Sequence, residues 1–196
     1  STPEYGDIVI AVPKNRREDL IKRVVGLPGD RVAVINGQIV LNGKPVPQAV
    51  EPAIRIPVDA NQPCDPFTFP AMQARLPSGR EICEMPVLRE TLPNGASYLV
   101  IDHLDQTLDH IDEFTVPAGH VFLMGDNRDH SADGRASLAE NGLGGPVPLS
   151  DIGGRAEFVA FSLDGSEAWN PLSWWPSLRR DRGWQTLRPR IETGAE

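Results

Sequence analysis

Hydrophobic residues in this chain cluster in short β-branched runs and not in long helical stripes. Residues 6–12 (GDIVIAV) and 20–25 (LIKRVV) are rich in Val and Ile, and a polar or turn segment follows each of them. Short runs of this composition, bounded by turn residues, are typical of strands. We therefore expect two strands here, the second with Lys22 and Arg23 in its middle.

Residues 31–46 give the clearest local prediction. The stretch RVAVINGQIVLNGKPV places Asn36 and Gly37 between two alternating runs, and Asn-Gly is the dipeptide that a type I′ hairpin turn prefers. A second Asn-Gly at 42–43 ends the returning strand. Further strands are expected at 96–104, on both sides of a PAG turn at 117–119, and at 155–162.

Prolines and glycines set the fold class. The 196 residues include 19 Pro and 18 Gly, and Pro breaks helices and central strands alike. Low helix content follows, and we predict a mainly β fold of antiparallel sheets forming one domain over residues 1–196. Residues 45–95 are Pro-rich with few periodic apolar stretches, so we expect a smaller inserted lobe there.

Charge and hydropathy exclude some functions. The net charge of −8 leaves no basic stripe to neutralise phosphates, which argues against a nucleic-acid partner. No run of 18 apolar residues is long enough to cross a membrane as a helix. The chain has no initiator Met and enters a strand almost at once, so we expect that an upstream segment is missing.

The two cysteines, Cys64 and Cys83, have two interpretations. In an exported protein they would form a disulfide that closes a loop, whereas in the cytosol they would be ordinary thiols. No CxxC pair or Cys/His cluster is present, and the four His show no ligand spacing, so we predict neither a metal nor another cofactor.

The segment from residue 169 onward holds all four tryptophans together with several arginines. It is either a short helix that packs Trp onto the core or an interfacial segment that lies on a membrane surface. The tryptophans are Trp169, Trp174, Trp175 and Trp184.

Lys22 also has two interpretations. It points to solvent from one face of a strand, or it is desolvated among Ile, Leu and Val. Burial disfavours the charged ammonium and lowers a lysine pKa, so a desolvated lysine can act as a general base near neutral pH.

Residues 125–135 (GDNRDHSADGR) form a dense polar stretch directly after an apolar run; we call them the polar loop. Ser131 offers a hydroxyl that can orient an amine without charging it. Asp133 and Arg135 are spaced to pair locally, and Asn127, Arg128 and Asp129 can satisfy one another and the backbone. A surface loop or a calcium loop is the alternative, but Arg128 and His130 stand where calcium needs oxygen ligands.

Taken together, these stretches resemble bacterial type I signal peptidase, the leader peptidase that removes signal peptides from exported proteins. Three blocks carry the resemblance: YGDIVIAV at 5–12, IKRVVGLPGD at 21–30 and MGDNRDHSADGR at 124–135. The likeness covers most of the chain, more weakly between residues 45 and 95. It implies a Ser-Lys peptidase fold and a catalytic domain on the periplasmic side of the cytoplasmic membrane, with exported preproteins as partners.

The resemblance assigns roles residue by residue. Lys22 would be the catalytic lysine, Ser131 would hydrogen-bond its amine, and Asp133 would pair with Arg135. Asp126, Asn127 and Arg128 would support the same loop. Two shallow apolar pockets would select Ala-x-Ala sites, and the substrate would bind as an added strand. The candidates for contacting it are Ile21 and, on a strand that offers a possible edge, Ile8 and Val9.

The chain departs from the family pattern in two places. Gly134 stands where the family usually has Ser. The family nucleophile, a Ser in a Ser-Met-x-Pro block, has no counterpart, and Ser1 lacks the Met and Pro that would make it one. We therefore expect the chain as printed to be inactive. The alternatives are a conjugative-transfer Ser-Lys peptidase and a non-catalytic β-domain that binds a protein partner.

Overall fold

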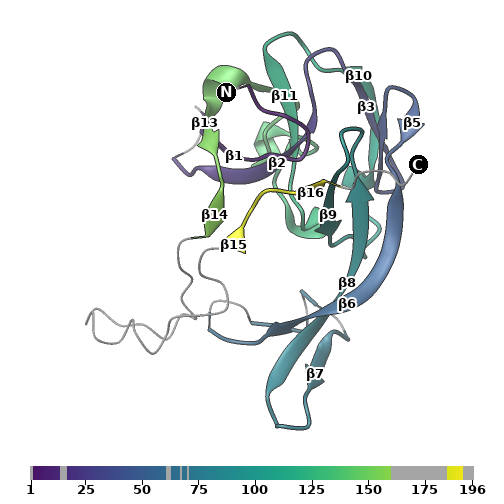
Figure 1. Cartoon of the computed structure of the whole chain (residues 1–196), viewed down its shortest axis with the longest axis vertical. Coiled ribbons are helices and arrows are strands. Elements are labelled where there is room, and N and C mark those ends of the chain that lie inside the picture. Colours follow the sequence, from purple (N-terminus) through teal and green to yellow (C-terminus); the bar gives the residue numbers. More distant parts are fainter. Residues whose placement is uncertain are drawn as a thin grey trace. The chain divides into compact units, whose positions relative to one another are not determined.

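The computed structural model describes residues 2–13, 17–60, 63–66, 68–69, 71–159 and 185–191. Strands dominate these residues, and their helical content consists of short 3-10 turns. The prediction of a mainly β, antiparallel protein with little helix is confirmed for this part of the chain. Figure 1 labels the strands along the chain.

The elements follow one another along the chain with short connections. The strands are β1 (Ile8–Ala11), β2 (Leu20–Gly26), β3 (Arg31–Ile35), β4 (Gln38–Leu41), β5 (Lys44–Pro45), β6 (Gln48–Pro57), β7 (Gln73–Arg75), β8 (Glu81–Thr91), β9 (Ala96–Val100), β10 (His110–Thr115), β11 (His120–Met124), β12 (Val147–Pro148), β13 (Ile152–Arg155), β14 (Phe158–Val159), β15 (Gln185–Thr186) and β16 (Arg190–Ile191). The 3-10 turns are η1 (Thr107–Asp109), η2 (Arg128–His130), η3 (Leu138–Glu140) and η4 (Leu149–Asp151).

The chain divides into two compact units. The first contains residues 1–51, 87–157 and 188–196, and the second contains residues 52–86 and 158–187. All site residues predicted from the sequence, apart from the cysteines and the tryptophans, belong to the first unit.

A five-stranded sheet in the order β12-β11-β2-β1-β13 holds the first two sequence blocks. Val9 lies opposite Lys22 and Ile8 opposite Arg23 across β1 and β2, while Met124 of β11 lies opposite Arg23 on the other side of β2. β2 therefore occupies the middle of the sheet, and both of its edges are paired at Arg23.

The predicted hairpin is present in a second sheet, of order β10-β3-β4-β5. Asn36 and Gly37 both have positive φ, 50° and 78°, as a type I′ turn requires. Asn42 and Gly43 repeat this conformation, with φ of 53° and 77°, and turn β4 into β5. Both Asn-Gly predictions are confirmed.

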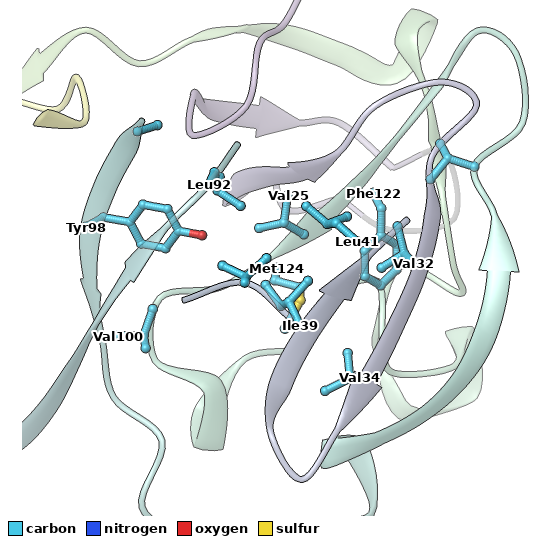
Figure 2. Packing of buried hydrophobic residues seen from close by; sticks show 13 residues of the cluster. Val25, Val32, Val34, Ile39, Leu41, Leu92, Tyr98, Val100, Phe122 and Met124 are labelled. Atoms are coloured by element: carbon cyan, nitrogen blue, oxygen red, sulfur yellow. The ribbon is translucent and has the colours of Figure 1, made fainter. Parts of the chain in front are cut away.

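The main core lies between these two sheets and strands β8 and β9. Figure 2 shows its side chains converging from separate strands. Its fully or nearly buried members include Val25, Val32, Val34, Ile39, Leu41, Leu92, Tyr98, Val100, Phe122 and Met124. A second, smaller cluster covers the other face of the β2 sheet and contains Val9, Ala11, Val24, Val121, Leu123, Leu143 and Val147.

Residues 45–95, in which the sequence shows few periodic apolar stretches, nevertheless contain long strands. This range contains β6, with 10 residues, and β8, with 11. Prolines in these strands had argued against regular structure. Pro52 and Pro57 lie in β6, the last strand of its sheet, where a missing N–H is tolerated. Pro86 lies in β8 between the segments that pair with β7 and β9.

Of the strand predicted at 155–162, residues 160–162 lie outside the described residues. The structure has β13 at Ile152–Arg155 and the short β14 at Phe158–Val159. Gly153 and Gly154 lowered the strand signal of β13, although an edge strand accepts them. All four tryptophans lie outside the described residues, so both interpretations of that segment stay predictions.

The second unit is held by a disulfide between Cys64 and Cys83, whose Cα atoms are 5.6 Å apart. The disulfide interpretation of the two cysteines is thereby confirmed. Both cysteines are buried together with Met72, Ile82 and Met85. Because so few apolar side chains contribute little burial energy, the disulfide provides much of the local stability of this unit.

The polar loop is packed onto β11 through a glycine. A Cβ atom at Gly134 would lie 2.5 Å from Cε2 of Phe122 and 2.9 Å from the carbonyl oxygen of Leu123. The Gly134 N–H donates to that same carbonyl at 2.9 Å. The Phe122 ring therefore occupies the space that any side chain at position 134 would need.

We expect the double substitution Cys64→Ser/Cys83→Ser to loosen the second unit alone. Losing this link should lower its local stability by about 3 kcal/mol. Hydrogen exchange followed by mass spectrometry should show faster exchange at residues 73–75 and 81–83, while β2 and β11 keep their protection. Equal loss of protection in β2 and β11 would show that the two units unfold together.

We expect Gly134→Ser to lower the free energy of unfolding by about 2 kcal/mol, because the new side chain overlaps the Phe122 ring. Denaturant unfolding measures this loss. In a Phe122→Leu background the same change should cost clearly less. Gly154→Ala is the matched control, since no atom lies within 4 Å of a Cβ at that position. Equal costs in both backgrounds would contradict the overlap.

Candidate active site

Lys22 lies on a buried face of the β2 sheet. Strand residues alternate between faces, so Lys22 shares its face with Leu20 and Val24 and, across the register, with Val9. Val24 and Val9 are 0% and 1% exposed, and Lys22 itself is half-buried. We call this the lysine face. Lys22 is thus neither fully exposed nor fully buried, and its role as a base stays a prediction.

The register also places Gly125 beside Lys22. Met124 pairs with Arg23, so the next residue of the β11 chain comes opposite Lys22 and on the lysine face. A Cβ atom at Gly125 would lie 2.5 Å from the Cβ of Ser131. The Ser131 side chain thus fills the space above Gly125 and stands on the same face of the sheet as Lys22.

The Ser131 hydroxyl is buried and has no hydrogen-bond partner. The hydrogen bond expected between Ser131 and the Lys22 amine is therefore not formed, although the register brings both residues to one place. A lysine amine sits on a flexible four-carbon stem and can take several positions on such a face. A buried hydroxyl without a partner is costly and is often found at functional sites.

Asp133 and Arg135 form the predicted local pair. Arg135 Nε donates to Asp133 Oδ1 at 3.0 Å, and Arg135 Nη2 donates to Oδ2 at 3.1 Å. Both side chains are buried. Asp133 Oδ2 also accepts the N–H of Gly125 at 2.8 Å. The pair therefore fixes the end of the loop directly to the residue beside Lys22.

The expectation that Asn127, Arg128 and Asp129 satisfy one another and nearby backbone groups holds only for the backbone. Arg128 Nε donates to the Gly125 carbonyl at 3.1 Å, but the main side-chain partners lie elsewhere. Arg128 reaches out of the loop to Glu90 of β8, with Nη1 and Nη2 donating to its two carboxylate oxygens at 2.8 and 2.5 Å. Burial raises the pKa of Glu90, but the Arg128 charge and its hydrogen bonds outweigh burial and hold that pKa below its usual value. The side chains are 1% and 0% exposed.

Asp126 and Asp129 likewise have partners outside the loop. Arg23 donates from Nε and Nη2 to Asp126 at 2.7 and 2.6 Å, and its guanidinium lies 4.1 Å from the centre of the Tyr98 ring. Asp129 accepts the backbone N–H of His103 at 3.0 Å. Asn127 Oδ1 is buried without a hydrogen-bond partner.

The three residues suggested for substrate contact do not share one face. Val9 is on the lysine face, whereas Ile8 and Ile21, opposite Arg23 and Ile10 across the β1–β2 register, alternate to the other face. Ile21 is 64% exposed. The suggestion that the strand at 6–12 offers an open edge is wrong, because β1 is paired with β2 on one side and β13 on the other.

Sequence reasoning missed several residues of this site. Glu90 carried no signal, because its role depends on a contact 38 positions away. Gly125 could be found only from its register. Arg23 was visible as a second charge inside an apolar strand. Gly134, the departure from the family pattern, is explained by the Phe122 ring.

The described residues contain no group of three or more His, Cys, Asp or Glu side chains placed to hold a metal ion. Within the same part of the chain, we find no helix long and apolar enough to cross a membrane.

The family model described as signal peptidase, peptidase S26, matches residues 1–161. Signal peptidase I of Rickettsia bellii (strain OSU 85-389) is 31% identical over 184 residues, covering 90% of this chain and 51% of its own length. That of Rickettsia canadensis (strain McKiel) is 32% identical over 183 residues, covering 88% and 55%.

A crystal structure of a signal peptidase I from Enterococcus faecalis V583 is similar over 79% of this chain and 97% of its own, with 19% identity and a TM-score of 0.39. The fold described above rests on the strand pairings of this chain itself. The chain spans about half the length of the curated relatives that it matches. The family match covers the polar loop, the lysine strand and the sheet that joins them, and on this ground the chain belongs to the signal peptidase family, peptidase S26.

Proposed function

We propose that this chain supplies the general base of a signal peptidase I that removes signal peptides from exported preproteins. The observation that carries the proposal is the placement of Lys22 on a buried, apolar face next to the Ser131 hydroxyl. Apolar surroundings favour a neutral amine, and a neutral amine can accept a proton.

The mechanism would be acyl transfer by a serine and a lysine. A serine upstream of this chain attacks the carbonyl carbon of the scissile peptide bond, and Lys22 takes the hydroxyl proton as the bond forms. Lys22 then gives this proton to the leaving amine. In the second step Lys22 takes a proton from water, whose oxygen attacks the acyl carbon. Lys22 then gives this proton to the serine oxygen as the ester bond breaks, which regenerates the serine hydroxyl and the neutral amine. Backbone N–H groups near the serine would stabilise the oxyanion.

The substrate would bind as a strand along β2. The Val24 N–H donates to the carbonyl of Asp7 at 2.9 Å, so the backbone groups of Val24 point toward β1. Backbone groups alternate in direction along a strand, so those of Ile21 point away from β1. β11 pairs with β2 only from Arg23 onward. An extended peptide can therefore pair with Ile21 and pass directly beside Lys22. Small apolar pockets there would select Ala-x-Ala sites.

The location is proposed on similar grounds. A disulfide such as Cys64–Cys83 persists in oxidising compartments, which supports a position on the extracytoplasmic side of the cytoplasmic membrane. Signal peptides emerge on that side when preproteins are exported. Contact of Trp169, Trp174, Trp175 and Trp184 with the membrane surface would fit this position and is part of the proposal.

We expect Lys22→Ala, made in the protein with its natural upstream sequence, to lower kcat/KM for a preprotein by at least about 10²-fold. Lys44→Ala is the matched control, because Lys44 is exposed on β5, and it should keep the parent rate. Circular dichroism checks that both variants fold. Parent-level cleavage by Lys22→Ala would reject the proposal, and a non-catalytic binding domain would then be the better reading.

We expect Ser131→Ala to lower the rate about tenfold, which corresponds to one hydrogen bond to a charged group. The melting temperature should not fall, because the buried hydroxyl has no partner to lose. This combination separates the two roles of Ser131. Loss of stability with an unchanged rate would instead mean that the serine supports only the loop.

A further inference from the structure

Arg135 has a second carboxylate neighbour that neither the sequence blocks nor the proposed mechanism includes. Its Nη1 lies 3.8 Å from Oδ1 of Asp109, and the two side chains are 1% and 7% exposed. The other nitrogens are engaged elsewhere, with Nε on Asp133 and Nη2 on Asp133 and the Arg128 carbonyl. Charges that are so buried attract one another more strongly than at the surface.

Asp109 is itself held on two sides. Its Oδ2 accepts the N–H of Gln106 at 2.7 Å, and its carbonyl accepts the N–H of Gly37 at 3.1 Å. Gln106 Nε2 donates to the carbonyl of Asp129 at 3.0 Å. We call residues 102–110 the support loop, because it connects the hairpin turn at Gly37 with the polar loop.

The polar loop and the groups packed around it contain more acids than bases. The basic groups are the guanidiniums of Arg23, Arg128 and Arg135 and the ring of His103, whose Nδ1 lies 2.5 Å from Asp129; the carboxylates near them are those of Glu90, Asp109, Asp126, Asp129 and Asp133. An additional carboxylate in this region must therefore ionise against negative charge.

Asp102 is that additional carboxylate. A Cβ atom at Gly37 would lie 3.3 Å from Asp102 Cγ, so the carboxyl group rests on the hairpin turn. The pKa of Asp102 is raised to about 6, mainly by burial and further by the charges of Asp109 and Asp129, against the opposing charges of Arg128 and Arg135. Asp102 lines a hollow of about 380 Å³ together with His103, Asp105, Asp109 and His110.

We propose that Asp109 is a positioning residue that holds Arg135 against Asp133, and that ionisation of Asp102 weakens the support loop that carries Asp109. Asp102 and Asp109 lie on the same short loop. Asp102 packs against Gly37, and the Gly37 N–H donates to the carbonyl of Asp109. The relevance of this positioning role to catalysis rests on the proposed function, whereas the placement of Arg135 and of the support loop does not.

The sign of the pH effect follows from the raised pKa of Asp102. Neutral Asp102 is compatible with the acid-rich surroundings, so its stabilising contribution is complete below the usual pKa of an aspartate. This contribution is lost as the pH rises through about 6, because the folded loop must then accept another negative charge. The support loop should open more often at pH 7.5 than at pH 5.

The positioning role is tested by amide hydrogen exchange on this chain, which needs no peptidase activity. In Asp109→Asn, the N–H groups of Gly125 and Arg135, which donate to Asp133, should exchange about tenfold faster. A tenfold change corresponds to the free energy of a one-unit shift in pKa. Asp112→Asn, at an exposed position of β10, is the control and should change neither. Unchanged exchange at both amides in Asp109→Asn would overturn the proposal.

The pH dependence is tested at the Gly37 amide, after correction for intrinsic exchange. Its protection should fall about tenfold between pH 5 and pH 7.5 in the parent and stay constant in Asp102→Asn. Asp105→Asn is the matched control, because Asp105 lines the same hollow but is 96% exposed; it should behave like the parent. The same pH dependence in Asp102→Asn as in the parent would overturn the role of Asp102. Either result leaves the peptidase assignment to be decided by Lys22→Ala.

Discussion

The buried pair between Arg128 and Glu90 is the interaction on which the candidate site depends. Both side chains are almost fully excluded from solvent, and a charge in such a place must be paired to be tolerated. The pairing requires the polar loop to lie against β8 and in one orientation. With Arg128 fixed, Arg135 can donate to the Arg128 carbonyl and hold Asp133, which in turn binds the Gly125 N–H. The position of Ser131 beside the lysine strand is the end of this chain of contacts.

The parts of the structure that sequence reasoning predicted are those determined by near neighbours. The Asn-Gly turns need positive φ at two adjacent residues, and the Asp133–Arg135 pair joins residues two positions apart. β1 and β2 followed from β-branched runs. The contacts that were not predicted join residues far apart in the sequence: Glu90 lies 38 positions from Arg128, and Asp126 lies 103 positions from Arg23. No local pattern carries such information, so the loop's side chains were expected to satisfy one another and nearby backbone groups.

The two long strands within residues 45–95 were not predicted, for a different reason. Pro is unfavourable in a strand only where its missing N–H would have joined a ladder. β6 ends its sheet and β8 changes partners along its length, so the prolines cost little there. Whether a proline lies at such a position depends on the sheet as a whole. Composition therefore indicated the fold class, but it did not reveal these two long strands.

The distribution of partners also explains how a lysine could remain neutral beside so acidic a loop. A nearby carboxylate favours the charged amine, yet three carboxylates of the polar loop have other positive or donor groups. Asp126 is bound by Arg23, whose side chain alternates away from the lysine face, Asp133 is bound by Arg135, and Asp129 accepts backbone N–H groups. What the loop offers on the lysine face is the hydroxyl of Ser131 above a glycine. The acid-rich composition thus serves to build the loop, and the alternation of β2 separates that charge from Lys22, the proposed base.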